Sequence, residues 1–454
     1  MDVLGKPIFR KDGIANVTAE KRFVDDISFP SMLWIKAVRS PVIRGRIKRI
    51  DVSKAYEVEG LVTVITAKDV PNNIYCPLES IGVGPPDEPI LAEDEVMYKG
   101  EPIAICVAET LEQAKKAADA IKVEIDELPP VLDVEEALSP YSPIIKKWGI
   151  NAFIYGSGKD GATRPGGIGH PFFKIIKGDI DRAFSIADHV IEGKYKFSPI
   201  EHAALETQVA LAKPEGGRIK LYTSTQSPFL TKTVIENVLK LKPGTLNVIV
   251  EAVGGAFGGK VDVAVEPLTV LAAIKTGRPV KWRWTRKEEF IASSTRSGGV
   301  IEIKDAVTDN GLILGRKVKY LHDAGAYSRT SPYGLMKSAV NLCGPYYIPN
   351  VYIEAYCVYT NHQPASSMRG YGLWEASYAI EVQMEKIART LRIDSWRIRF
   401  LNAYRNGQTS CTGVKINDAY LIETMKAVVE KIGVRLDNDL LAMTSSDWKG
   451  GLET

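Results

Sequence analysis

Cysteine and histidine are scarce in this chain of 454 residues, which has five of each. The cysteines are far apart and never take C-x-x-C spacing, which excludes a disulfide framework and an iron–sulfur cluster held by this chain alone. The histidines are equally dispersed, and no spacing typical of a zinc site occurs. The cysteines are Cys76, Cys106, Cys343, Cys357 and Cys411, and the histidines are His170, His189, His202, His322 and His362.

Long apolar runs and a net charge of one sign are also missing. No apolar run reaches the roughly 18 residues that a transmembrane helix needs. The 58 Lys and Arg residues nearly balance the 55 Asp and Glu residues, which gives no electrostatic reason to bind nucleic acid or an anionic membrane. The N-terminal stretch MDVLGKPIFRKDG has no apolar segment of a secretory signal, so the sequence predicts a cytoplasmic protein.

No internal repeat of about 20 to 50 residues is found, which excludes a solenoid. A chain of 454 residues is long enough for two or three domains. The sequence predicts an α+β protein with a first domain at residues 1–138, a linker at 139–178, and a second domain at 179–454. The linker prediction depends on the Gly-rich stretch YGSGKDGATRPGGIGHP, which shows little periodicity.

The first domain has the pattern of a small α/β unit. Two apolar, β-rich runs precede Thr110, and Thr110 and Gln113 have the spacing of a capping box, which predicts a helix starting there. An alternating segment then predicts a strand that ends at Pro129 and Pro130.

The second domain alternates expected strands and helices. One long helix is predicted where Ala376, Ile380, Met384 and Ile387 fall on one face. Expected strands lie at 189–198, 218–225, 246–253, 280–285, 299–307 and 316–327, and expected helices at 230–239, 266–276 and 374–392.

A glycine-rich turn connects two of these elements in VEAVGGAFGGKVDVAVEPL. Gly254, Gly259 and Lys260 fit the phosphate-binding pattern G-x-x-x-x-G-K, but Val261 stands where that loop needs a Ser or Thr hydroxyl for magnesium. The sequence therefore disfavours a nucleotide-binding loop. Two interpretations stay open from this segment alone: a structural turn, or a turn whose backbone N–H groups approach another ligand.

Other segments resemble one enzyme family in the order in which that family has them. EAVGGAFGGK resembles a signature of the large subunit of the molybdenum hydroxylases, which include xanthine dehydrogenase and aldehyde oxidoreductase. The stretches before residue 138 look like that family's α/β hammerhead domain, and the resemblance runs from Gly5 to about Gly433. It implies a hammerhead domain followed by the first molybdopterin-binding α+β domain. The further matching segments are TSTQSPF at 223–229, SMRGYG at 367–372 and the expected strand IEHAALETQVALA at 200–212.

The resemblance assigns the glycine turn to the cofactor. Backbone amides of the turn would contact the pterin and the ligands of the metal, and Phe257 would also shape the pocket wall. Gln226 would hydrogen-bond a metal ligand, although it could instead cap the following helix. The cofactor-binding residues of the turn are Gly254, Gly255, Ala256, Phe257 and Gly258.

Two more positions follow from the RGYG segment. Arg369 would position the pterin or an oxygen ligand, partly through its backbone, or would form only a surface ion pair. Tyr371 would line the substrate channel, where its ring could stack on a planar substrate. His202 and Glu206 are interpreted as structural residues.

The substrate pocket departs from the purine hydroxylases at three places. Val261 stands where they have Glu, and Lys337 aligns with their Arg. Trp374 and Glu375 replace their Pro-Gln pair. Losing one charge and changing the other argues against xanthine and favours an N-heterocycle such as nicotinate, with an aldehyde or a purine as alternatives.

The resemblance also implies cofactors and partners. Molybdenum would be held by molybdopterin cytosine dinucleotide, with no direct protein ligand from this chain. No second pterin-binding segment follows Arg369, so a second molybdopterin-binding subunit would supply the catalytic Glu, as in the nicotinate dehydrogenase type of the family. Fe–S and FAD subunits would carry electrons away after hydroxylation of a small-molecule substrate with water. A non-catalytic assembly half-subunit is the remaining alternative.

Overall fold

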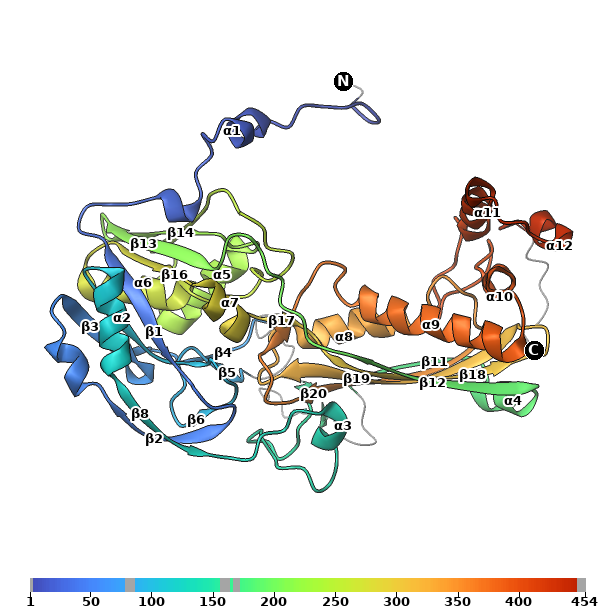
Figure 1. The fold of residues 1–454 in the computed structure, drawn as a ribbon, viewed down its shortest axis with the longest axis horizontal. Helices are drawn as coiled ribbons and strands as arrows, with labels where there is room; N and C mark the ends of the chain where they lie inside the picture. The colour runs from blue at the N-terminus through green and yellow to red at the C-terminus, as the bar shows by residue number, and fades with distance from the viewer. Residues whose placement is uncertain (1–2, 78–85, 156–163, 166–171, 447–454) are drawn as a thin grey trace.

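The structure is a computed structural model that describes residues 3–77, 86–155, 164–165 and 172–446. Most of the Gly-rich part of the predicted linker, at 156–163 and 166–171, lies outside the described residues. Two lobes lie side by side, and the N-terminal segment with α1 (Gly13–Val17) projects from the first lobe (Figure 1). No helix within the described ranges has both the length and the hydropathy of a membrane-spanning segment.

A seven-stranded sheet forms the centre of the first lobe, in the order β15-β14-β13-β16-β1-β7-β3. Three of its strands come from the predicted first domain and four from the predicted second domain. The two groups meet where β1 pairs in parallel with β16, with Leu33 opposite Val280. The strands are β1 (Leu33–Arg39), β3 (Leu61–Thr66), β7 (Pro102–Ala108), β13 (Val209–Glu215), β14 (Arg218–Thr223), β15 (Leu246–Val250) and β16 (Val280–Arg283).

The first helix of this lobe confirms the predicted capping box. In α2 (Leu111–Ala120) the Thr110 side chain accepts a hydrogen bond from the Gln113 backbone, and the Gln113 side chain accepts one from the Thr110 backbone. The buried face of α2 consists of alanines, so the helix lies close against β1 and β7. A small separate sheet contains β6 (Glu95–Val96), β2 (Gly45–Asp51) and β8 (Lys122–Glu127).

A five-stranded sheet forms the second lobe, with α8 (Ser331–Ala339) and α9 (Leu373–Leu391) along it (Figure 1). One of its strands, β11 (Phe173–Lys177), falls within the predicted linker. That end of the segment is therefore part of the sheet, because it pairs with β20. The other strands are β12 (His189–Phe197), β18 (Gly299–Val307), β19 (Ile313–Gly325) and β20 (Asn350–Tyr359).

The predicted apolar face of α9 forms part of the core of this lobe. Ala376, Ile380, Met384 and Ile387 are each no more than 1% exposed. Within the same lobe, Arg316 and Asp305 form a fully buried ion pair with two hydrogen bonds, at 2.7 and 3.0 Å. Paired in this way, the two charges can remain inside the lobe.

Shorter elements complete the described chain. The helices are α3 (Val134–Ala137), α4 (Ile180–Ser185), α5 (Pro228–Leu239), α6 (Glu266–Thr276), α7 (Arg286–Ala292), α10 (Ser395–Asn402), α11 (Leu421–Ile432) and α12 (Asn438–Ala442), with 3-10 turns η1 (Val24–Asp26), η2 (Ser53–Glu57) and η3 (Ala67–Asp69). The strands are β4 (Ile74–Tyr75), β5 (Glu88–Pro89), β9 (Ile154–Tyr155), β10 (Arg164–Pro165), β17 (Thr295–Arg296) and β21 (Ala365–Ser366).

Candidate functional site

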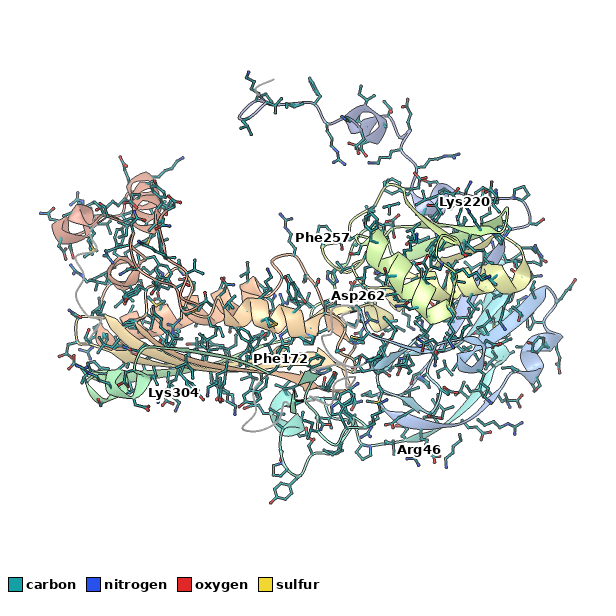
Figure 2. The ribbon with its side chains drawn as sticks, turned by 180° about the vertical axis from the view of Figure 1, so that it is seen from behind. Arg46, Phe172, Lys220, Phe257, Asp262 and Lys304 are labelled. Atoms are coloured by element: carbon teal, nitrogen blue, oxygen red, sulfur yellow. The ribbon has the colours of Figure 1, made fainter. Side chains whose placement is uncertain are left out.

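The glycine turn leaves β15 and leads to α6, at the side of the first lobe that faces the second (Figure 2). Gly255 and Gly258 have φ angles of +98° and +103°. Phe257 also has a positive φ, +53°, which is uncommon for a residue with a Cβ and is often found at functional sites. A Cβ on Gly258 would lie 2.5 Å from the carbonyl oxygen of Ser367, so glycine allows these two segments to touch.

A buried ion pair between Glu206 and Lys260 holds the turn in place. The Glu206 carboxylate accepts hydrogen bonds from the Gly254 N–H at 2.9 Å and from the Lys260 ammonium at 2.7 Å. Lys260 is only 2% exposed. The lysine that would reach phosphates in a nucleotide-binding loop is therefore bound to Glu206, which is a second argument against that interpretation.

The segment that contains Glu206 is not the strand that the resemblance suggested. β13 begins only at Val209, and residues 201–208 form an irregular loop with Ala203 at a φ of +52°. Within this loop the Glu206 backbone N–H donates to the Gly254 carbonyl at 3.0 Å. The loop therefore follows the glycine turn instead of a neighbouring strand.

Gln226 binds the turn from the other side. Its side-chain oxygen accepts the Gly258 N–H at 3.0 Å and the Lys260 N–H at 3.3 Å, and its own backbone N–H donates to the Lys260 carbonyl at 2.8 Å. These donors identify the oxygen of the amide, so its NH2 group faces elsewhere. The alternative of a helix cap is wrong, because α5 has Ser227 at its N-cap position and no side-chain capping bond.

The RGYG segment lies directly against the turn. The Arg369 N–H donates to the Phe257 carbonyl at 2.8 Å, while the Arg369 side chain is exposed. His202 Nε2 lies 2.7 Å from the Ser367 carbonyl, which can only accept, so Nε2 carries the proton. Burial lowers the pKa of His202, which keeps the ring neutral. His202 therefore joins the two segments, consistent with its structural interpretation.

Hydrogen-bond donors without partners gather at the outer side of the turn. Within the described ranges, the N–H groups of Gly255, Ala256 and Phe257 donate to no protein acceptor, whereas those of Gly254 and Gly258 do. The Gln226 NH2 group likewise has no described acceptor, and its side chain is exposed. Four donor groups with no acceptor among them suit an electron-rich or anionic ligand.

A second wall of the site follows α8. The Tyr371 hydroxyl donates to the Thr330 carbonyl, and its ring lies over Gly334, where a Cβ would be 2.8 Å away. Tyr333 lies beside it, with ring centroids 6.0 Å apart. Lys337 is exposed, and its ammonium lies 5.4 Å from the Tyr333 ring centroid. The structure therefore places Lys337 and Tyr371 both beside Tyr333, and their role in a substrate pocket stays a prediction.

Tyr333 was missed by the sequence analysis. It precedes Lys337 by four residues, and on a helix that spacing places two side chains on one face, which was the available signal. The remaining predicted pocket residue, Val261, is half-buried at the end of the glycine turn, where its N–H donates to the Gly258 carbonyl at 3.3 Å.

Trp374 and Glu375 pack into the protein. The Arg296 guanidinium carbon lies 3.1 Å from the centroid of the Trp374 ring. Glu375 is 1% exposed and accepts a hydrogen bond from the Ser338 hydroxyl at 3.0 Å. Burial raises the pKa of the Glu375 carboxyl. Glu375 therefore joins α9 to α8 from inside, and Trp374 packs against Arg296.

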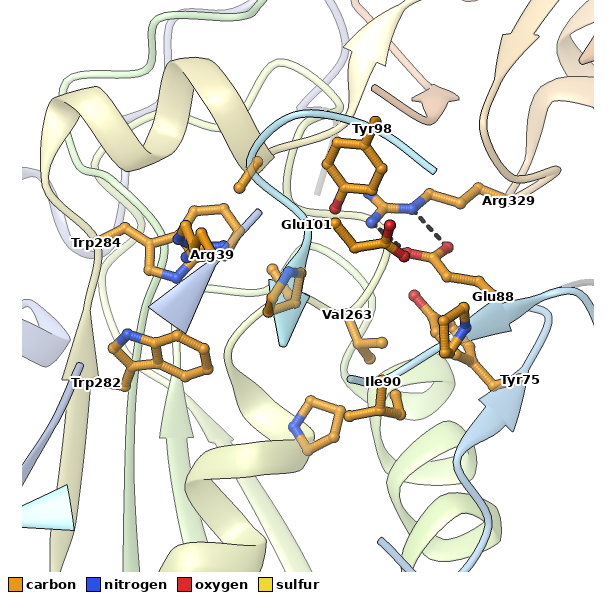
Figure 3. A pocket seen from close by; sticks show the side chains of 15 residues that line it. Arg39, Tyr75, Glu88, Ile90, Tyr98, Glu101, Val263, Trp282, Trp284 and Arg329 are labelled. Atoms are coloured by element: carbon orange, nitrogen blue, oxygen red, sulfur yellow. Dashed lines mark hydrogen bonds and ion pairs between the residues drawn. The ribbon is translucent and has the colours of Figure 1, made fainter. Parts of the chain in front are cut away.

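A separate cavity of about 30 Å³ is lined by Tyr98, Val263 and Trp284 among others (Figure 3). Glu88 and Arg329 form a buried, two-bonded ion pair at its edge, at 2.7 and 2.9 Å. Glu101 lines it too, and burial raises the pKa of Glu101 to about 7. The cavity has room for water but is far below the roughly 300 Å³ at which ligand pockets begin. The open surface at the turn is therefore a better candidate site than this cavity.

Two family models match this chain. Residues 18–129 match the aldehyde oxidase and xanthine dehydrogenase a/b hammerhead domain, and residues 164–403 match the molybdopterin cofactor-binding domain. The second match covers the glycine turn, Gln226, Arg369 and α8, which are the parts assembled above.

Curated relatives agree with the family models. The chain is 32% identical to the nicotinate dehydrogenase large molybdopterin subunit of Eubacterium barkeri, over 94% of this chain and 96% of that subunit. It is 33% identical to a probable xanthine dehydrogenase subunit of Bacillus subtilis, over 88% of this chain and 51% of that protein.

Solved structures show the same fold. The aldehyde oxidoreductase of Desulfovibrio gigas superposes with a TM-score of 0.85 at 28% identity, over 93% of this chain and 46% of that one. The chain thus spans about half the length of that enzyme and of the B. subtilis protein. These matches confirm the predicted α+β architecture, and the chain belongs to the xanthine dehydrogenase family of molybdenum-dependent oxidoreductases, with a hammerhead domain followed by a molybdopterin cofactor-binding domain.

Proposed function

We propose that this chain is the larger molybdopterin-binding subunit of a multi-subunit hydroxylase that acts on an electron-poor carbon of a carboxylated N-heterocycle. The observation that carries the proposal is the set of donors at the glycine turn: the N–H groups of Gly255, Ala256 and Phe257 and the NH2 group of Gln226. The division of the chain into residues 1–138, 139–178 and 179–454 also stays a prediction.

The donor set suits the molybdenum cofactor, whose oxygen, sulfur and phosphate atoms accept hydrogen bonds. Glycine at 254 and 258 lets the turn lie close against Glu206 and Ser367, and Arg369 adds an exposed positive charge beside Phe257. When bound, the cofactor supplies a Lewis acid and a redox centre, while protein groups orient the reactants. We propose the cytosine dinucleotide form, with no metal ligand from this chain.

The donors lie on an exposed surface, since Phe257 is 46% exposed and Leu205 beside the turn is 93% exposed. A dry active site requires a cover. A second molybdopterin-binding subunit that carries the catalytic Glu would supply it, consistent with the name of the E. barkeri relative. The scattered cysteines offer no ligand set for an Fe–S cluster, so we propose that Fe–S and FAD centres lie on further subunits of a cytoplasmic complex.

The substrate class follows from the α8 wall. The Lys337 ammonium offers a positive charge for a carboxylate, and Tyr333 and Tyr371 offer ring faces for a planar heterocycle. Val261 gives no acceptor to the ring N–H groups of a purine. These features favour a nicotinate-like substrate over an aldehyde or xanthine.

The test is to purify the complete complex and analyse its metal, its pterin nucleotide and its substrates. We expect molybdenum with a cytosine dinucleotide, and the highest kcat/KM for pyridine-3-carboxylate under anaerobic conditions with an artificial electron acceptor. A complex without molybdenum would support the assembly half-subunit instead. Highest activity on xanthine or on an aldehyde would reject the substrate class and keep the cofactor.

A further inference from the structure

The segment that follows Arg369 is attached to α8 along most of that helix. At the start of α8, the Tyr371 hydroxyl donates to the Thr330 carbonyl. In the middle, a Cβ on Gly372 would lie 2.6 Å from the Gly334 oxygen and 2.7 Å from the Lys337 Cβ, so the two backbones touch. Only glycine permits this approach, because any side chain at position 372 would clash with α8.

Glu375 makes the attachment at the other end of α8. Its Oε1 accepts the Ser338 hydroxyl at 3.0 Å and lies 3.5 Å from the Tyr320 hydroxyl. Ser338 and Tyr320 are fully buried, and Glu375 is 1% exposed. Its second oxygen is buried without a partner among the described residues. Burying a carboxyl group with one oxygen unpaired costs free energy. The one hydrogen bond of good length, from Ser338, therefore indicates a specific role for Glu375.

Ser338 directly follows the residue that carries the charge of the pocket wall. Within the described ranges the Lys337 ammonium forms no ion pair, and the group described beside it is the Tyr333 ring, whose centroid lies 5.4 Å away. The position of that charge therefore depends on where α8 places its backbone and on the Tyr333 ring beside it. A shift of the last turn of α8 would move the ammonium with it.

We propose that Glu375 is a positioning residue for substrate recognition, which through Ser338 holds the last turn of α8 so that Lys337 meets the carboxylate of the substrate. This inference rests on the proposed function, because it needs a carboxylated substrate at the α8 wall. It assigns a role to the residue that replaces the Gln of the purine hydroxylases.

The test compares a charged and an uncharged substrate of the same shape in variants of the complete complex. Glu375→Ala and Ser338→Ala should each raise KM for pyridine-3-carboxylate about tenfold and change KM for pyridine-3-carboxamide less than about twofold, at similar kcat. Glu375→Gln keeps an oxygen for Ser338 and should restore the carboxylate KM. Calorimetric binding of benzoate, which carries the carboxylate but lacks the ring nitrogen, should weaken in the two alanine variants.

The matched control is Gln383→Ala, on the same helix. Gln383 is fully buried and holds α9 to the sheet through the Ile191 carbonyl and Asp305, and none of its described hydrogen bonds goes to α8. This variant should lose stability without changing the ratio of the two KM values. If Glu375→Ala is too unstable to purify, Ser338→Ala answers the same question.

The deciding quantity is the ratio of KM for the carboxylate to KM for the carboxamide. If this ratio keeps its native value in Ser338→Ala, or changes by the same factor in Gln383→Ala, the positioning role is overturned. A native complex that does not prefer the carboxylate over the carboxamide overturns the proposed substrate class itself, and the inference falls with it. The first result leaves the proposed function intact, so the two failures can be told apart.

Discussion

The glycine turn and α8, which we propose as two walls of one site, are held in place differently. The turn is fixed by buried polar partners, with Glu206 and Lys260 below it and the Gln226 oxygen beside it. The charge on α8, at Lys337, has no ionic partner among the described residues and stands at the surface. The turn would bind the same cofactor whatever the substrate, so it can be rigid. The substrate wall carries its charge on an exposed side chain, which can be replaced without changing the fold.

The largest effect should come from breaking the ion pair below the turn. Lys260→Met leaves the Glu206 carboxylate without its cationic partner, and we expect a loss of about 3 kcal/mol in the free energy of unfolding. The turn should also lose its geometry, so the complex should retain little molybdenum. Denaturant unfolding and metal analysis measure both effects. Lys213→Met breaks an ion pair in which both side chains are at least 30% exposed, and it is the control. Equal losses in both variants would contradict a rigid cofactor wall.

Gln226 separates the support of the turn from the contact with the ligand. Gln226→Ala should reduce kcat by up to about 10²–10³-fold, the range for an oriented donor near a reacting centre, and leave the complex folded. Gln226→Glu keeps an oxygen for the Gly258 and Lys260 N–H groups but removes the NH2 donor, so it should lose turnover with an intact turn. Full turnover in Gln226→Glu would show that only the oxygen matters.

A smaller effect is expected at the substrate wall. Lys337→Gln should raise KM for pyridine-3-carboxylate by a factor equivalent to roughly 1–3 kcal/mol, because the substrate carboxylate would lose its charged hydrogen-bond partner. Molybdenum content and the unfolding free energy should not change, because Lys337 is exposed. Steady-state kinetics and metal analysis of the same preparation check this. Loss of metal in Lys337→Gln would remove the contrast between the two walls.

The smallest expected effect is a pH dependence of stability that comes from Glu101 in the small cavity. Burial raises the pKa of Glu101 from 4.5 to about 7. Between these values the folded protein keeps the proton that the unfolded chain loses, so this carboxyl should make the protein less stable as pH rises through that window. Glu101→Gln should flatten the loss, as measured by denaturant midpoints from about pH 4.5 to about pH 7. An unchanged slope would mean that other groups dominate.

Local patterns in the sequence predicted most of the elements but not their assembly. The Thr110 capping box, the apolar face of α9 and the glycine turn are encoded by neighbouring residues, and the structure confirms them. The ion pair of Glu206 with Lys260 joins residues 54 positions apart, and β11 and β20 are further apart still. Patterns among neighbouring residues could therefore predict neither contact. The spacing of Tyr333 from Lys337 was a local signal, but the contact of Tyr333 with Tyr371 joins residues 38 positions apart (371 − 333).

The parallel pairing of β1 with β16 has a consequence for the integrity of the chain. A protease that cuts in the Gly-rich segment between the predicted domains would leave β1, β3 and β7 hydrogen-bonded to a sheet whose other strands belong to the second fragment. The two pieces should stay together until the protein is denatured. Expression of residues 1–138 alone would remove β16 and expose the edge of β1, which favours aggregation. We therefore expect that the hammerhead part is not stable as an independent domain.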